Sequence, residues 1–119
     1  MGRPLTKAEA GAAVRRGAQV EQFLSLCGGQ AAYLTASATG DAVSVRRHVV
    51  HDEGGPDFHD ISAFTPVGED EDAGEGVIIG TYSEPVEAVE SASAHGGDPD
   101  RWVNAGMAAD DYWRVKQGG

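Results

Sequence analysis

The chain has 119 residues, 40% hydrophobic and 24% charged, and this composition favours one folded domain over a disordered chain. Its 17 glycines are dispersed and no apolar run approaches the roughly 20 residues of a membrane span, which argues against collagen-like and membrane-spanning proteins. A single cysteine excludes an internal disulfide framework. We therefore expect a soluble, cytoplasmic single domain over residues 1–119, with residues 1–5 and 117–119 frayed.

The net charge of −10 is unevenly distributed along the chain. Residues 1–50 carry six bases against three acids, whereas residues 51–119 carry three bases against 16 acids. Such a field repels nucleic-acid phosphates and anionic membranes and attracts basic partners. The charge pattern therefore favours a basic protein partner, with no nucleic acid and no membrane. A simpler alternative, that the acids only keep a small protein soluble, stays open.

A long first helix is expected over about 6–27. Thr6 and Glu9 have the spacing of a capping box, in which each side chain binds the backbone N–H of the other. Small and apolar residues then recur at three- and four-residue steps as far as Cys27. The following Gly28 and Gly29 supply a left-handed residue that would end this helix.

Four strands are expected next. Their predicted ranges, from alternating or apolar patterns, are 30–38, 42–51, 58–65 and 77–82. Short polar or glycine-rich segments separate them, which favours an antiparallel meander.

Two helices are expected after the last strand. Ser83 is a candidate N-cap for a helix that runs to about Ala94, and Asp98 with Pro99 repeats the start signal for another. The last helix would carry Trp102 on the apolar stripe that docks on the sheet, so we expect Trp102 to be buried. This helix would either break at Asp110 or continue through the next turns. The predicted fold is therefore α+β: an N-terminal helix, a four-stranded antiparallel meander sheet and two C-terminal helices that pack on it (α-β-β-β-β-α-α).

Histidines and acids gather between His48 and Asp60, where the pattern suggests metal-binding chemistry. Pairing of the strands 42–51 and 58–65 would bring His51 toward His59, which makes these two the weak metal candidates. However, His48 and His51 point to opposite faces of a strand, and the spacing matches no zinc signature. We expect no metal and no cofactor.

Two acidic segments are the candidate partner-binding sites. The first is a run of acids in the loop before the last strand: Glu69, Asp70, Glu71, Asp72 and Glu75. The second combines two acids with a large aromatic residue in the last helix: Asp110, Asp111 and Trp113. A solvated loop and a core-packed helix are the alternatives to these roles. An exposed aromatic side chain beside carboxylates is, however, typical of an interface anchor.

Charge, size and the lack of a catalytic signature together favour a non-enzymatic interaction protein. An acidic surface is attracted to a basic cleft and blocks it, so an immunity protein or an inhibitor of a protein with a basic site is the leading hypothesis. Two alternatives remain. One is a ligand-binding or enzymatic α+β domain that uses the hairpin from His48 to Asp60. The other is a structural subunit of a viral or secretion assembly. The sequence leaves the oligomeric state open.

Overall fold

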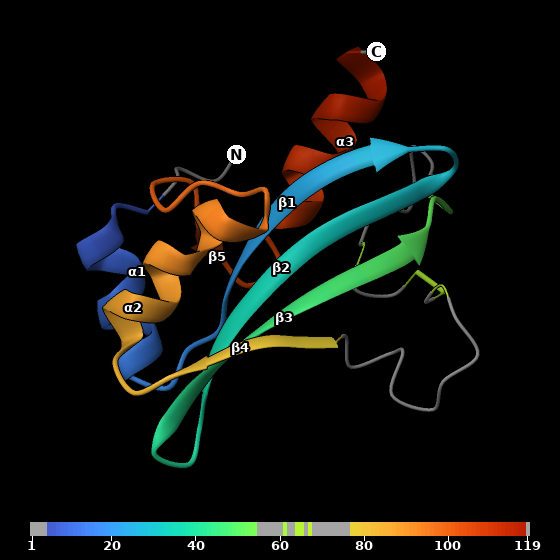
Figure 1. Ribbon diagram of the computed structural model, residues 1–119. Coiled ribbons are helices and arrows are strands. Elements are labelled where there is room, and N and C mark those ends of the chain that lie inside the picture. The colour runs from blue at the N-terminus through green and yellow to red at the C-terminus, as the bar shows by residue number, and fades with distance from the viewer. Residues whose placement is uncertain (1–4, 55–60, 62–63, 66, 68–76, 119) are drawn as a thin grey trace.

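A computed structural model describes residues 5–54, 61, 64–65, 67 and 77–118 of the protein (Figure 1). These residues form an α+β domain, as predicted. Its strands are β1 (Val20–Cys27), β2 (Gln30–Thr39), β3 (Ala42–His51), β4 (Val77–Tyr82) and the short β5 (Val103–Asn104). Its helices are α1 (Lys7–Arg15), α2 (Pro85–Glu90), the 3₁₀ helix η3 (Ser91–His95) and α3 (Ala108–Gly118).

The strands form one antiparallel sheet in the order β4-β3-β2-β1-β5. Strands β1 to β4 follow the chain as a meander, and β5 adds a fifth strand beside β1. The predicted strands 30–38, 42–51 and 77–82 are confirmed as β2, β3 and β4. Three of the five strands were therefore predicted, whereas β1 and β5 were predicted as helix and the predicted strand 58–65 is not among them.

The predicted helix over 6–27 is wrong beyond its first half. Its capping box is confirmed, since the Thr6 side chain accepts from the backbone of Glu9 and the Glu9 carboxylate accepts from the backbone of Thr6. The helix nevertheless ends at Arg15, and Gly17 follows in the left-handed region at φ 92°. Val20 is fully buried, but from a strand. A short apolar run fits either period, and here pairing with β2 decides the outcome.

Gly28 and Gly29 connect β1 to β2 as the two-residue turn of a hairpin. Their φ angles are 61° and 77°, both in the region that side chains with a Cβ rarely adopt. Two consecutive positive φ angles are typical of the tight turn that matches the twist of paired strands. The glycine pair that predicted a helix end therefore closes a β-hairpin.

The predicted strand 58–65 lies largely outside the described residues. Of the residues within it that are described, Ile61 lies in a 3₁₀ turn and Phe64 in a bend, so neither is in a strand. The backbone still runs beside the end of β3. His51 N–H donates to the carbonyl of Thr65 at 2.8 Å, and Val67 N–H donates to the carbonyl of Val49 at 2.9 Å.

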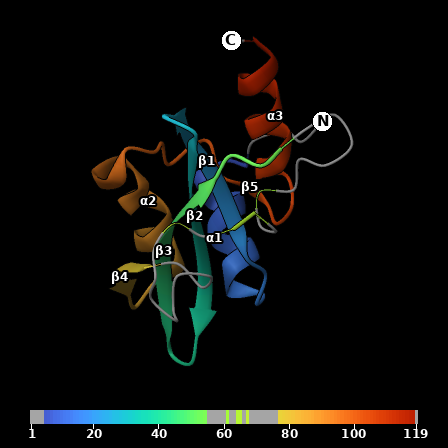
Figure 2. The same cartoon turned by 90° about the vertical axis from the view of Figure 1, so that its right-hand side faces the viewer.

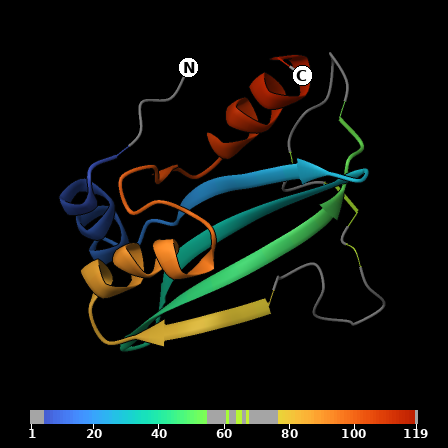
Figure 3. The ribbon, with the colours of Figure 1, turned by 45° about the horizontal axis from the view of Figure 1, so that its top comes forward.

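Helices cover both faces of the sheet rather than one. Helices α1 and α2 lie side by side on one face, and α3 lies across β1 on the other (Figures 1, 2 and 3). Alternation along each strand divides the core accordingly. In β2, Leu34 and Ala36 belong to the cluster under α1 and α2, whereas Ala31 and Tyr33 belong to the cluster under α3.

The C-terminal helices also differ from the prediction. The chain forms α2 and then η3, which ends at Gly96 with φ 85°. No helix begins at Asp98, because residues 98–101 form a turn in which Arg101 N–H donates to the carbonyl of Asp98 at 3.1 Å. The last helix, α3, begins only at Ala108.

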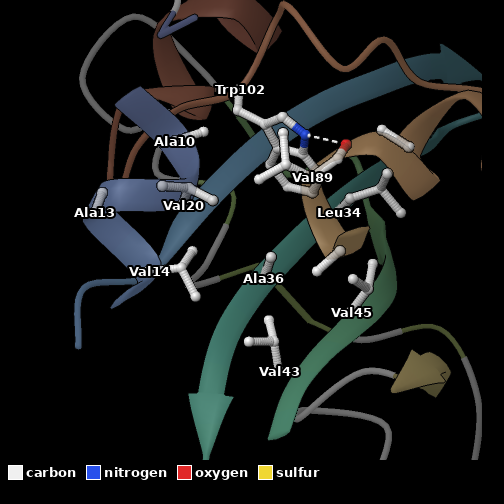
Figure 4. Close-up of a cluster of buried hydrophobic side chains, with 12 residues drawn as sticks. Ala10, Ala13, Val14, Val20, Leu34, Ala36, Val43, Val45, Val89 and Trp102 are labelled. Carbon is white, nitrogen blue, oxygen red and sulfur yellow. Dashed lines mark hydrogen bonds between the residues drawn. The ribbon is translucent and has the colours of Figure 1, made fainter. Parts of the chain in front are cut away.

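Trp102 is fully buried, as predicted, but it lies between that turn and β5 instead of in a helix. Its indole Nε1 donates to the carbonyl of Val89 in α2 at 3.0 Å (Figure 4). The side chain therefore holds α2 to the sheet. Trp102 and Trp113 do not share one helix face, since only Trp113 belongs to α3.

Candidate functional site

Of the two predicted partner-binding segments, only the one in α3 lies within the described structure. Residues 69–72 and Glu75 lie outside the described residues. Asp110, Asp111 and Trp113 are half-buried in the first turns of α3. A shallow hollow of about 260 Å³ is lined by Asp110, Trp113, Arg114 and Gln117.

These residues also have structural partners. Asp111 forms an ion pair with Arg114 at 3.3 Å, and Trp113 packs partly against the core cluster under α3. Carboxylates in the first turn of a helix are stabilised by the positive end of its dipole. Asp110 and Asp111 therefore stabilise α3 whether or not they bind a partner.

Glu21 is a buried carboxylate that supports the start of α3. It is 5% exposed, and its Oε1 accepts from the backbone N–H of Gly106 at 2.7 Å and of Ala108 at 3.0 Å. Sequence reasoning placed this residue in a long helix and missed the contact. The acceptor lies more than 80 residues from both donors, so no local signal could have identified it.

The histidines divide between the two faces of β3 as the strand pattern predicted. His48 is buried, whereas His51 is exposed at the strand end and His59 lies outside the described residues. Among the residues that the structure describes, no group of three His, Cys, Asp or Glu side chains is placed to hold a metal ion. His48 and His51 therefore cannot serve one ligand together.

His48 makes a specific set of contacts under the sheet face that carries α3. Its Nε2 lies 2.9 Å from Oγ1 of Thr35, and its ring stacks on that of Tyr33 with centroids 4.5 Å apart and planes 5° apart. Burial, followed by the nearby charge of Arg46, lowers the pKa of His48 to about 4. The ring is therefore neutral at pH 7 and serves as a fixed polar contact in the core.

A second polar cluster, which sequence reasoning missed, joins α3 to the end of β3. One carboxylate oxygen of Asp52, Oδ1, accepts from the hydroxyl of Tyr112 and from Nζ of Lys116, the latter at 2.9 Å. Lys116 Nζ also donates to the carbonyl of Gly54 at 2.8 Å. Burial raises the pKa of Asp52, but hydrogen bonds from Tyr112 and Lys116 outweigh it and hold this pKa below its usual value.

The four-residue spacing of Tyr112 and Lys116 was a usable signal for this cluster. Side chains at that spacing lie on one face of a helix. Their acceptor could not be identified from the sequence, because Asp52 is 60 residues from Tyr112. The cluster fixes the orientation of α3 and with it the position of the acidic first turn.

Comparisons with models of known protein families, with curated proteins and with solved structures find no match to this chain. Within the described residues, none of the helices has the length and apolar character needed to cross a bilayer. A functional proposal therefore rests on the charge pattern, the polar contacts of Glu21, His48 and Asp52, and the exposed surfaces.

Proposed function

We propose that the chain is a non-enzymatic protein-binding domain whose acidic surface covers a basic site on a partner protein, in the manner of an immunity protein or an inhibitor. The observation that carries this proposal is the concentration of acids after residue 50. Residues 55–76 contain seven acids and no lysine or arginine. A segment of this composition attracts a basic surface over a distance of about 10 Å at moderate ionic strength.

Ion pairs within the described structure each cancel one base against one acid, so the excess of acids after residue 50 is unchanged. Of the three bases after residue 50, Arg114 and Lys116 each lie against a carboxylate, that of Asp111 and that of Asp52. Their charges are therefore partly neutralised within the fold. Glu87, Glu90 and Asp100 are exposed and add to the negative field of this half of the chain.

The stability of the scaffold supports the same role. An inhibitor that associates quickly benefits from a surface that needs no rearrangement on binding. Trp102 and the Asp52 cluster fasten α2 and α3 to opposite faces of the sheet. Asp110 and Asp111 in α3 are thus held by a framework with two packed cores.

The test is a two-stage binding experiment. The immobilised chain captures proteins from a native lysate at low salt, and the partner is identified from those released as the salt concentration rises. Association rates are then measured with the purified partner. We expect a rate that falls steeply with salt, and a further decrease of about tenfold when residues 69–72 are changed to their amides.

The control variant is Asp41→Asn, which removes an exposed acid from the positively charged half of the chain. Its association rate should equal that of the unmodified protein. A partner with an acidic binding surface, or an association rate that salt does not change, would contradict the proposed function. Unchanged kinetics in the variant of residues 69–72 alone would exclude this segment as the contact.

A further inference from the structure

Helix α3 carries one carboxylate that has no partner in the described structure. The helix has four charged residues: Asp110, Asp111, Arg114 and Lys116. Asp111 pairs with Arg114 at 3.3 Å, and Lys116 pairs with Asp52 at 2.9 Å. Among the residues that the structure describes, the carboxylate of Asp110 has neither an ion-pair nor a hydrogen-bond partner. The unpaired charge of α3 is therefore negative.

This carboxylate lies at a shallow hollow, beside an aromatic residue. The hollow has a volume of about 260 Å³ and is lined by Asp110, Trp113, Arg114 and Gln117. Spacings of three and four residues place these side chains on one face of the helix. Trp113 is half-buried, so part of this residue remains accessible to a ligand. The hollow thus brings together an anionic group, an aromatic surface and a side-chain amide.

The size of the hollow favours a single side chain of a partner protein over a small-molecule ligand. Sites for drug-sized ligands usually measure about 300–1,000 Å³ and enclose most of the ligand surface. The hollow on α3 is smaller, and all of its lining comes from one helix. A side chain presented by another protein needs less enclosure, because the surrounding protein surfaces exclude water from the contact.

An arginine side chain matches the groups that line the hollow. Its guanidinium is planar and always charged, stacks on aromatic faces, and presents N–H donors that fit a carboxylate. The carboxylate of Asp110 would accept from it, and Trp113 would supply the aromatic face. The side-chain carbonyl of Gln117 would accept a further N–H. Lysine offers the same charge without the planar surface.

Arg114 is the one cation in the lining of the hollow, and its charge is already paired. It lies 3.3 Å from a carboxylate oxygen of Asp111. An acidic ligand would have to compete with Asp111 for this arginine and would also lie beside the unpaired Asp110. The charges of the described lining therefore favour a cationic ligand, although Arg114 still repels it. Removal of Arg114 should consequently strengthen binding.

We propose that the hollow on α3 binds an arginine side chain of the partner protein, with Asp110 as its ion-pair acceptor and Trp113 as its stacking surface. The basic character of the partner rests on the function proposed above. The position of the contact on α3, and arginine as the group recognised there, are the new inference.

The test is an NMR titration of the full chain with a capped tripeptide that has arginine between two glycines. The two tryptophan indole N–H signals are followed and are assigned with the variant Trp113→Phe. We expect the peptide to shift the Trp113 signal saturably and to leave the signal of the fully buried Trp102 unchanged. Citrulline has nearly the same shape as arginine without the charge, so the citrulline peptide should give no saturable shift. The lysine peptide should bind a few-fold more weakly.

Three substitutions test the roles of the charges. Asp110→Asn should weaken binding of the arginine peptide about twofold to fivefold, the range of an exposed ion pair. Arg114→Gln should strengthen it, because this change removes a like charge and releases the carboxylate of Asp111. Asp100→Asn is the matched control, since it removes the same charge from an exposed site outside α3, and it should leave binding unchanged. An unchanged Trp102 signal in each variant shows that the fold is intact.

Four outcomes would overturn the proposal. The absence of a saturable shift of the Trp113 signal would remove the site. An equal response to the citrulline peptide would show that the hollow does not recognise charge. Binding of a glutamate peptide instead would identify Arg114 as the contact and an acidic ligand as the occupant. A Trp113 signal that changes with protein concentration in the absence of peptide would identify a second copy of the chain as the occupant.

Failure of this site and failure of the proposed function give different results. If the arginine peptide does not bind but capture of the partner remains salt-dependent, the contact lies elsewhere and the proposed function stands. If capture does not depend on salt but the arginine peptide binds as expected, the proposed function is wrong and the arginine site on α3 is retained.

Discussion

The aromatic rings of Tyr33 and His48 stack directly across β2 and β3. The two residues are cross-strand partners, their ring planes differ by 5°, and both side chains are buried beneath the face that carries α3. Cross-strand pairs of this kind are the unit of stabilisation in a sheet. Here the pair also contains a titratable group, so it couples stability to pH.

The first prediction concerns that coupling. The pKa of His48 is about 4 in the folded protein, below its usual value of 6.5, so the unfolded chain binds more protons between these two pH values. The contribution of His48 to stability is therefore complete above pH 6.5 and decreases as the pH falls toward 4. Denaturant unfolding should show a loss of about 2 kcal/mol from this residue between pH 7 and pH 4.5.

The variant His48→Gln isolates this effect, because glutamine keeps a polar group near Thr35 but does not titrate. Its unfolding free energy should decrease less between pH 7 and pH 4.5 than that of the unmodified protein. His51→Gln, on the exposed side of the same strand, is the matched control and should follow the unmodified protein. Parallel curves for all three proteins would contradict the prediction.

The second prediction concerns the two tryptophans. Trp102 is fully buried and Trp113 is half-buried, so a soluble fluorescence quencher should reach one indole and not the other. Trp102→Ala should cost about 3–5 kcal/mol, as large-to-small changes in cores do. Trp102→Phe should cost less, but it leaves the carbonyl of Val89 without its indole donor. Quenching of Trp102 in the native protein would show that α2 does not pack as described.

The positions of helices and strands could be predicted where the local pattern was unambiguous. The alternation in β3 and the apolar run of β4 predicted both strands correctly, and the capping box of Thr6 and Glu9 predicted the start of α1. The pattern failed where one set of residues fits two periods. Val20 would lie in the core whether residues 20–27 formed a helix or a strand. Only the pairing of these residues with β2 distinguishes the two structures.

The polar contacts were less predictable than the strands. Glu21, His48 and Asp52 each depend on partners from another element, so their burial and pKa values follow from tertiary packing. The separation of His48 from His51 was predictable, because strand alternation alone places them on opposite faces. The burial of Trp102 was predicted correctly, but from the apolar stripe of an expected helix, and Trp102 does not lie in a helix.

The third prediction uses two glycines with opposite surroundings. A methyl group at Gly11 in α1 would lie 3.7 Å from the backbone of Val86, an ordinary contact, so Gly11→Ala should stabilise the protein by up to about 1 kcal/mol through helix propensity. A methyl group at Gly54 would lie 2.7 Å from a ring carbon of Tyr112. Gly54→Ala should therefore destabilise the protein by about 1–3 kcal/mol.

Thermal or denaturant unfolding of the two variants provides the measurement, and each serves as the control for the other. The same alanine is introduced in both, so a difference in sign reports the local space. Equal effects of the two substitutions would mean that Tyr112 does not lie against Gly54. That result would also question the contact of the Tyr112 hydroxyl with Asp52.

The last prediction concerns the cluster of Asp52, Tyr112 and Lys116. Tyr112 is fully buried, so Tyr112→Phe removes a hydroxyl whose hydrogen bond cannot be replaced by bulk water, and it should cost about 1–2 kcal/mol. Lys116→Met removes the other donor to Asp52 and should cost less than Tyr112→Phe, because the lysine is partly exposed. A double-mutant cycle should give a coupling energy of at least about 0.5 kcal/mol, since both donors share one carboxylate oxygen.

The coupling between Tyr112 and Lys116 should be full at pH 7 and decrease at acid pH. The pKa of Asp52 in the folded protein lies below its usual value of 3.8, so the stability that Asp52 contributes is lost as the pH falls below that value and the carboxylate is protonated. Additive effects at pH 7 would show that Tyr112 and Lys116 do not meet at Asp52, and the orientation of α3 would then depend on the core contacts of Tyr112 alone.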